Sequence, residues 1–273
     1  MRKLQIDSTR CIGCGLCAKD CLVGAIELDE HKIPHFTSSG AAQCIGCQHC
    51  LMICPKAALS LDGINPDDCV CSGNTPSPEQ TLALMRQRRS VRNYKQKNVA
   101  PEIMNSLLEN LRFVPTGVNL HTLSFGVIDD TERMKTFRAE LYEKIIRFYE
   151  TQPNAHEKVP YLYPVYQLVK AGFDPVFRTA PHAIFVSVKK DAVCKKEDPI
   201  IALSYFELLV KSYGLGSCWC DWLYHSIAQI APDMEAQLGI PDDYELAYAM
   251  IFGVPAVEYK RSGNPPAVPV KRV

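Results

Sequence analysis

The spacing of apolar residues predicts three β-strands beyond residue 120. Short runs rich in leucine, isoleucine, phenylalanine and valine cover residues 123–128, 183–188 and 245–252. Runs of this length and composition, bounded by polar or turn-forming residues, are typical of strands.

Between these strands the apolar residues recur with a helical period. The pattern predicts helices over residues 101–112 and 131–150. A further helix is expected to begin at Asp198, which is an N-cap residue type, with Pro199 in its first turn. Gly214 is expected to end this helix, because glycine readily adopts the left-handed conformation that follows a helix.

A fourth helix is expected before residue 101. Ser77 is expected to be its N-cap, Pro78 suits its first turn, and Gln80 completes a capping box. Residues 151–180 are rich in tyrosine and proline and predict an irregular insertion.

Helices and strands follow one another without a regular βαβ rhythm, which predicts an α+β fold. No GxGxxG or GxxxxGK loop occurs, so no built-in dinucleotide or ATP fold is expected.

Residues 1–62 contain an internal repeat. The eighteen-residue segments that begin at Cys11 and Cys44 are identical at eight positions, four of them cysteines. We expect two pseudo-symmetric halves, each with a cysteine loop, a short helix and a brief extended stretch. Residues 63–77 have the proline, glycine, asparagine and serine content of a linker. The expected domains are therefore 1–62 and 78–273.

Composition excludes several classes of protein. The chain has 273 residues, of which 47% are hydrophobic, so it can bury a core and global disorder is excluded. Its formal net charge of zero argues against nucleic acid as the main partner. No apolar run approaches the roughly 18 residues of a membrane span, and no apolar signal segment opens the chain. We expect a cytoplasmic protein in a reducing compartment, with no membrane partner.

Eight of the thirteen cysteines form two runs of identical spacing. In each run two residues separate three successive cysteines, and a fourth follows after three more. A tight loop of this kind points three thiolates at one [4Fe–4S] cluster, while the fourth cysteine starts a helix that leads to the other cluster. The expected ligands are Cys11, Cys14, Cys17 and Cys54 for the first cluster, and Cys44, Cys47, Cys50 and Cys21 for the second.

Two zinc sites are the alternative for these cysteines. Zinc usually takes two CxxC pairs across a longer loop, or mixed cysteine and histidine sets, so the repeated CxxCxxC pattern fits clusters better. Over residues 1–62 the sequence resembles the bacterial two-cluster ferredoxins, except that Leu22 stands where that family has a proline. Cys69 and Cys71 lie outside the pattern and are interpreted as linker cysteines without a metal role.

A basic segment, RQRRSVRNYKQK, covers residues 86–97 and contains no acid. Such a segment is typical of a solvated helix end, of a nucleic-acid patch, or of an anion site in which arginines and Ser90 donate to a phosphate. Composition alone does not choose among these. Four later motifs bear on the choice, namely PTGVN at 115–119, TAPH at 179–182, YGLGSCW at 213–219 and FGVP at 252–255.

In this order and at these distances, the motifs resemble the nitroreductase family of FMN enzymes over residues 79–262. The resemblance implies a nitroreductase-like α+β domain that forms an intertwined homodimer, with FMN in each of two interfacial pockets. It assigns residues of four segments to FMN. The basic segment supplies Arg88, Arg89, Ser90 and Arg92, and the partner subunit supplies Pro115, Thr116, Gly117 and Asn119. Leu215 and Gly216 are implied near the reactive ring edge, and Lys260 and Arg261 at the phosphate.

The chain departs from that family at two points. Where the family often has Asn-x-Gln-Pro-Trp, Asn119 is followed by Leu-His-Thr-Leu, so His121 is either a polar group near the flavin or a loop histidine without a chemical role. Residues 151–178 are an insertion whose aromatic residues either cover the flavin ring or pack the dimer interface. These aromatic residues are Tyr161, Tyr163, Tyr166 and Phe173. Cys218 and Cys220 are interpreted as small buried residues.

Iron–sulfur clusters and a flavin in one chain predict a converter between one-electron and two-electron chemistry. We expect the clusters to pass single electrons to FMN, which then reduces a small planar acceptor such as a nitroaromatic, a quinone or an activated alkene. The external donor is a ferredoxin-like protein or NAD(P)H. In the main alternative NAD(P)H reduces FMN and the clusters export electrons. In another, the protein is a non-enzymatic electron carrier.

Overall fold

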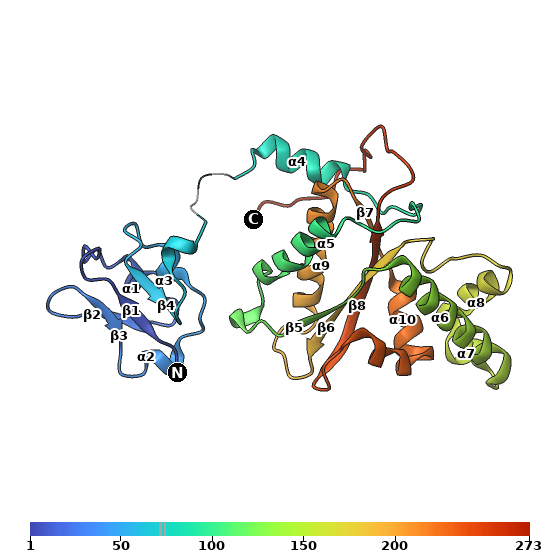
Figure 1. Cartoon of the computed structure of the whole chain (residues 1–273), viewed down its shortest axis with the longest axis horizontal. Coiled ribbons are helices and arrows are strands. Elements are labelled where there is room, and N and C mark those ends of the chain that lie inside the picture. The colour runs from blue at the N-terminus through green and yellow to red at the C-terminus, as the bar shows by residue number, and fades with distance from the viewer. Residues whose placement is uncertain (71–72, 74) are drawn as a thin grey trace. The chain divides into compact units, whose positions relative to one another are not determined.

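The computed structural model describes residues 1–70, 73 and 75–273, and these form two compact units (Figure 1). The first unit consists of residues 1–75 with 118–120, and the second of residues 76–117 with 121–273. Cys71, which was interpreted as a linker cysteine, lies outside the described residues. None of the helices in the described ranges combines the length and the hydropathy that a bilayer crossing requires.

Two short antiparallel sheets build the N-terminal unit, one from β1 and β4 and one from β2 and β3. The strands are β1 (Leu4–Ile6), β2 (Ile26–Leu28), β3 (Pro34–Phe36) and β4 (Leu59–Leu61). Three one-turn helices lie between them, α1 (Leu16–Lys19), α2 (Gly40–Gln43) and α3 (His49–Met52). Because α1 and α3 begin at equivalent positions of the repeat, the two halves have the same local structure.

A four-stranded antiparallel sheet in the order β5-β6-β8-β7 forms the centre of the second unit. Its strands are β5 (Leu123–Ile128), β6 (His182–Lys189), β7 (Gly216–Trp219) and β8 (Tyr244–Gly253). Three of them are the predicted strands. β7 was not predicted, because its four residues are too few and too mixed in polarity to show an alternating pattern.

The side chains of β6 alternate between two hydrophobic cores. Ala183 and Phe185 pack with α6 and α10 on one face, and Ile184 and Val186 pack with α5 and α9 on the other, all four being fully buried. Figure 1 shows the resulting three layers of helix, sheet and helix. The helices are α5 (Pro101–Glu109), α6 (Thr131–Thr151), α8 (Tyr163–Lys170), α9 (Glu197–Ser212) and α10 (Asp221–Ile230).

Of the two helix starts that were predicted from capping residues, one is confirmed and one is wrong. α4 (Pro78–Gln87) begins with the predicted capping box, in which the side chains of Ser77 and Gln80 accept from each other's backbone N–H. α9 begins one residue before the predicted cap. Asp198 does not cap it, because its carboxylate instead accepts from the backbone N–H of Gly117 at 3.0 and 3.1 Å.

The prediction of an irregular segment at 151–180 is wrong. The segment contains α7 (Ala155–Lys158), the 3₁₀ turn η4 (Pro160–Leu162) and α8. Its apolar residues Leu162, Val165 and Val169 are spaced three and four apart and are buried in the core that contains α6. This helical spacing was present in the sequence, but the high content of tyrosine and proline concealed it.

Candidate functional site

The eight repeat cysteines line two separate cavities of the N-terminal unit. The first cavity is lined by Cys11, Cys14, Cys17 and Cys54, and the second by Cys21, Cys44, Cys47 and Cys50. The fourth cysteine of each run therefore lies at the cavity of the other run. This grouping matches the exchanged ligand sets that the spacing predicts.

Glycines shape both cysteine loops. Gly13 and Gly46 hold equivalent positions in the two repeats, and their φ angles of +63° and +67° lie in the left-handed region that favours glycine. A Cβ on Gly13 would lie 2.8 Å from the Cβ of Lys32, and one on Gly46 would lie 2.4 Å from the Arg2 guanidinium. Each loop therefore lies closely against another segment of the N-terminal unit, and only glycine permits this approach.

Backbone amides donate to the two exchanged cysteines. The N–H of Ala25 lies 3.3 Å from Cys21 Sγ, and the N–H of Ala58 lies 3.3 Å from Cys54 Sγ, again at equivalent positions of the repeat. Hydrogen bonds to ligating sulfurs favour the thiolate and raise the reduction potential of an iron–sulfur cluster.

Two of these thiols have a raised pKa, so a positively charged metal core favours the loss of their protons. Burial raises the pKa of the Cys50 thiol to about 11, and the neighbouring thiols Cys44 and Cys47 add to this rise. Burial likewise raises the pKa of Cys17, which lies among the thiols of the first cavity. Binding of metal must therefore displace these protons, as it does at other thiolate sites.

The arrangement of the thiols suits a cluster better than a single ion. A tetrahedral zinc with Zn–S bonds of about 2.3 Å requires sulfurs about 3.8 Å apart. Among the described residues, no three Cys, His, Asp or Glu side chains converge closely enough to hold one metal ion. Each set of four thiols instead lines a cavity.

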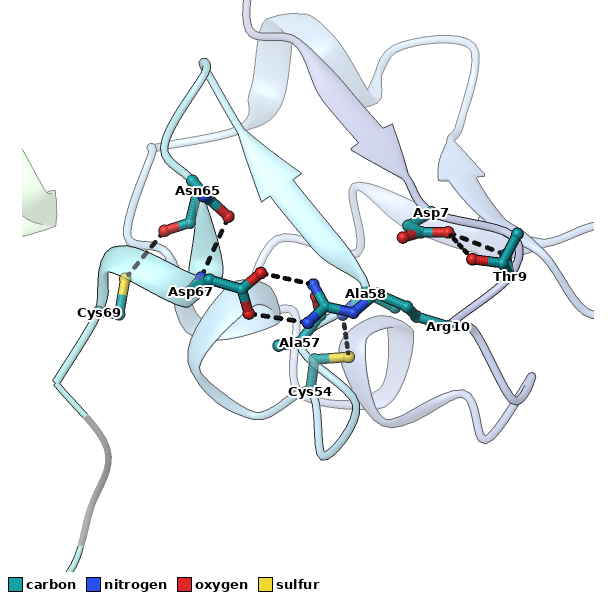
Figure 2. A network of polar contacts seen from close by, with 9 residues as sticks. All are labelled: Asp7, Thr9, Arg10, Cys54, Ala57, Ala58, Asn65, Asp67 and Cys69. Carbon is teal, nitrogen blue, oxygen red and sulfur yellow. Dashed lines mark hydrogen bonds and ion pairs between the residues drawn. The ribbon is translucent and has the colours of Figure 1, made fainter.

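Arg10 joins the two loops that supply the first cavity (Figure 2). Its guanidinium donates to both carboxylate oxygens of Asp67 at 2.9 and 2.8 Å, and to the carbonyl of Ala57 at 2.9 Å. Arg10 directly precedes Cys11, and Ala57 follows Cys54 closely. The contact therefore connects the segments that carry the first and last ligand candidates of this cavity, and it lowers the pKa of Asp67.

Residues after the repeat continue this network. Asn65 accepts from the backbone N–H of Asp67 at 3.1 Å and so caps the 3₁₀ turn η1 (Pro66–Asp68). Cys69 donates to the carbonyl of Asn65 at 3.7 Å and lines neither thiol cavity (Figure 2).

A larger cavity of about 280 Å³ lies in the second unit, where the basic segment passes the start of β7. We call it the arginine cavity. Five of the residues that the resemblance assigns to FMN line it, namely Arg88, Arg89, Leu215, Gly216 and Arg261.

Close backbone contacts hold the basic segment against β7. Ser90 and Ser217 form a parallel β-bridge, and the N–H of Val91 donates to the carbonyl of Ser217 at 2.9 Å. A Cβ on Gly216 would lie 2.5 Å from Val91 Cγ2, so only glycine permits this approach. Gly214, with φ of +72°, ends α9 and turns the chain into β7.

The arginine cavity is positively charged. Arg88 forms an ion pair of 3.0 Å with Glu207, a side chain of α9 that is only 7% exposed, and this pair orients the guanidinium. Within the described part of the chain, Arg89 and Arg261 have no acidic partner. Lys260 does not line the cavity and pairs with Glu258 at 2.5 Å. Two unpaired guanidinium groups are a fitting site for a phosphate.

The other residues assigned to FMN lie elsewhere. Arg92 lines a neighbouring cavity. None of Pro115, Thr116, Gly117 and Asn119 lines the arginine cavity of the same chain. Their loop includes the 3₁₀ turn η3 (Gly117–Asn119), and Val118 has φ of +54° within it. Such a conformation is costly for a β-branched residue, and strain of this kind clusters at functional sites.

His121 belongs to the same loop. Its φ is +49°, and its backbone N–H donates to Thr116 Oγ1 at 2.9 Å. Sequence reasoning missed the buried acid Glu207, which anchors Arg88, and interpreted Asp198 as an N-cap, whereas it anchors the loop at Gly117. Their position in the apolar helix α9 was the available signal, because buried acids are rare unless they are paired.

The aromatic residues of the insertion do not act as one group. Tyr163 and Tyr166 pack on Tyr149 of α6, with ring centroids 5.7 and 4.9 Å apart. Tyr161 lines the same neighbouring cavity as Arg92, and Phe173 is 64% exposed. Cys218 and Cys220 are buried as interpreted, and burial raises the pKa of Cys220 to about 12.

Family models match two regions of the chain. Residues 85–254 match the Nitroreductase family, and residues 4–61 match a 4Fe-4S dicluster domain. The first match covers more than half of the chain. The chain therefore belongs to the nitroreductase family of FMN-dependent oxidoreductases, and it carries an N-terminal 4Fe-4S domain in addition.

Solved structures of this family share the fold. A nitroreductase with bound FMN from Bacteroides fragilis is 20% identical, with a TM-score of 0.56 over 71% of this chain and 99% of that one. An FMN-dependent nitroreductase from Clostridium difficile is 18% identical, with a TM-score of 0.54 over 72% and 100%. A nitroreductase with bound FMN from Desulfitobacterium hafniense is 19% identical, with a TM-score of 0.54 over 70% and 98%. The predicted α+β fold class is confirmed. No curated protein matches the chain in a sequence search.

Proposed function

We propose that this chain binds two [4Fe–4S] clusters and FMN, and that it reduces a small planar acceptor with electrons that arrive through the clusters. The observation that carries this proposal is the presence in one chain of two four-thiol cavities and a cationic cavity built on the RRSVR segment. When bound, the clusters supply one-electron transfer and FMN supplies two-electron reduction. We place the protein in the cytoplasm, where reducing conditions preserve thiolate ligands.

The arginine cavity is the proposed phosphate end of the FMN site. Arg89 and Arg261 have no acidic partner among the described residues, and Glu207 pairs with the third arginine, Arg88. Ser90 lies at the bridge to β7, between Arg89 and Arg92 in the sequence. These residues bind and orient the cofactor. The absence of a side chain at Gly216 lets the cofactor and the basic segment approach β7 closely.

A homodimer is proposed to complete this site, with Pro115, Thr116, Gly117 and Asn119 supplied by the partner subunit. Helix α9 supports the proposal, since its residues are apolar almost all round and such helices are normally buried. Its outward stripe of Ile201, Tyr205 and Leu208 is nevertheless partly accessible in the single chain, and Tyr205 is 52% exposed. A second copy would cover this stripe.

The direction of electron flow is tested by replacing a cluster ligand. We expect Cys14→Ser to lower ferredoxin-driven reduction of a nitroaromatic more than tenfold, because the first cluster is lost. Reduction of the flavin by NADH should change less than twofold. Anaerobic stopped-flow absorbance with each donor measures both rates.

Cys69→Ser is the matched control, because Cys69 lies outside both thiol cavities. It should leave both rates unchanged. Rapid flavin reduction by NADH and none by ferredoxin in the unaltered protein would reverse the proposed direction. A colourless protein that contains zinc would contradict the cluster assignment altogether.

A further inference from the structure

A second cavity of about 160 Å³ lies beyond the arginine cavity in the second unit. Residues 87–89, Val91 and residues 214–217 contribute to the arginine cavity, whereas Arg92 and residues 218–222 contribute to the second one. Because Ser90 and Ser217 are paired in parallel, the two segments run together from one cavity to the next. We call the second one the tryptophan cavity.

Aromatic side chains wall the tryptophan cavity. Trp219 and Trp222 are half-buried, and Tyr161 projects from the insertion with 49% of its surface exposed. Flat, polarisable walls of this kind favour a planar ligand, which can stack on them. The cavity is therefore suited to an aromatic or quinonoid acceptor.

The acid in this cavity is already engaged by neighbouring groups. The hydroxyl of Tyr161 donates to Asp221 at 2.5 Å, and that of Tyr248 donates to the other carboxylate oxygen at 3.1 Å. His225 lies 3.5 Å from the same oxygen as Tyr248. Both carboxylate oxygens of Asp221 therefore have partners, and neither forms an ion pair with Arg92 or Arg178, the two arginines of the cavity.

Arg92 and Arg178 both line the cavity, and neither forms an ion pair with any residue that the structure describes. The guanidinium of Arg178 lies over the ring of Trp222, 6.0 Å from its centroid. A guanidinium on an aromatic wall with no acidic partner is well placed to receive a carboxylate as a forked pair.

The backbone at Arg178 is held in an unfavourable conformation. Arg178 and Thr179 have φ angles of +51° and +59°, in the region where residues other than glycine are uncommon. The Asp174 carboxylate sustains this turn by accepting from the N–H groups of Phe177 and Thr179 at 3.0 and 2.7 Å. Arg138 lies 3.4 Å from Asp174 and supports it. Local strain sustained by surrounding contacts is characteristic of functional positions.

We propose that the tryptophan cavity is the acceptor site, and that Arg178 makes it selective for planar acceptors that carry a carboxylate. This inference rests on the proposed function, since it assumes that the acceptor is reduced beside the arginine cavity. Arg178, unlike Arg92, belongs to the insertion and has no assigned role toward the cofactor. The insertion therefore supplies substrate selectivity to this chain.

Two acceptors of nearly equal shape test the inference, 4-nitrobenzoate and the uncharged 4-nitrobenzamide. Their dissociation constants are measured by equilibrium dialysis against the oxidised holoprotein, and kcat/KM is measured anaerobically with reduced donor. In Arg178→Gln we expect affinity and kcat/KM for 4-nitrobenzoate to fall about 10- to 100-fold, as for a lost hydrogen bond to a charged group. The values for 4-nitrobenzamide should change less than twofold.

Two further variants separate charge from folding. Arg178→Lys retains the positive charge but not the fork, so it should recover part of the affinity for 4-nitrobenzoate. Arg147→Gln removes an arginine that is exposed on α6 and pairs with Glu143, and it should leave both acceptors unaffected. Flavin content and thermal midpoint show whether each variant is folded.

The results distinguish this inference from the proposed function. Equal losses for both acceptors in Arg178→Gln, or no loss for either, would overturn the selectivity. So would the failure of wild-type holoprotein to bind 4-nitrobenzoate more tightly than 4-nitrobenzamide. Selective binding in dialysis without any turnover would leave the anion site standing and refute the proposed electron path.

Discussion

At the scale of single residues, close approach matters as much as charge in the second unit. Arg88 and Arg89 belong to the arginine cavity only because the segment that carries them lies directly on β7. That contact requires the missing side chain of Gly216, since an added Cβ would overlap Val91. A neutral residue therefore controls the position of the cationic ones.

Gly216→Ala is expected to lower the free energy of unfolding by about 1–3 kcal/mol, the usual range for overpacking. FMN affinity should fall at least tenfold, because the basic segment must move away from β7. Fluorescence titration with FMN and thermal denaturation measure the two effects. Adding Val91→Gly removes the atoms that clash, so the double variant should bind FMN more tightly than Gly216→Ala. Unchanged FMN affinity in Gly216→Ala would contradict this account.

At the scale of elements, the short turn η1 stabilises the first thiol cavity from outside the repeat. Asp67 lies within residues that were expected to be linker, yet it receives both arms of the Arg10 guanidinium. Arg10 and Asp67 are 40% and 53% exposed, so each contact is weak in water, but the forked geometry favours the pair. The turn therefore packs with the cysteine repeat in the N-terminal unit and supports the loop that carries Cys11.

This ion pair predicts a pH dependence of cluster retention. The pKa of Asp67 is lowered by Arg10, so the pair stabilises the fold above the usual aspartate value of 3.8 and is lost as the pH falls below it. At pH 7, Asp67→Asn should accelerate the loss of cluster absorbance by up to about fivefold. The difference from wild type should shrink as the pH falls below 3.8 toward the lowered pKa of Asp67. Asp68→Asn, an adjacent exposed acid, should behave as wild type, and an equal effect of both variants would refute the role of the pair.

At the scale of the whole molecule, the stripe of α9 predicts a dimer. Analytical ultracentrifugation at micromolar concentration should show two copies. Tyr205→Glu should shift the protein toward monomer and weaken FMN binding, because a charge cannot be buried unpaired in an apolar interface. Leu168→Glu places the same charge on α8, where Leu168 is 38% exposed, and should leave the dimer intact. Dissociation by Leu168→Glu alone would place the interface at the insertion instead.

Sequence reasoning succeeded where information is local. The cysteine spacing predicted how the thiols are grouped, and the strands at 123–128, 183–188 and 245–252 followed from apolar composition. The capping box at Ser77 was also predicted, because its two hydrogen bonds join residues three apart. The same approach failed for α8, whose helical spacing was concealed by its tyrosines.

The sequence by itself determined the cysteine repeat, most of the secondary structure and the motifs of the nitroreductase family. Only the tertiary structure decided that Glu207 holds Arg88, that Asp198 anchors Gly117, and that Arg178 lies over Trp222. These partners are separated by up to 119 residues. The physical reason is that periodicity and capping report contacts within a few residues, whereas the pairing of distant side chains depends on how the sheet and its two helical layers pack.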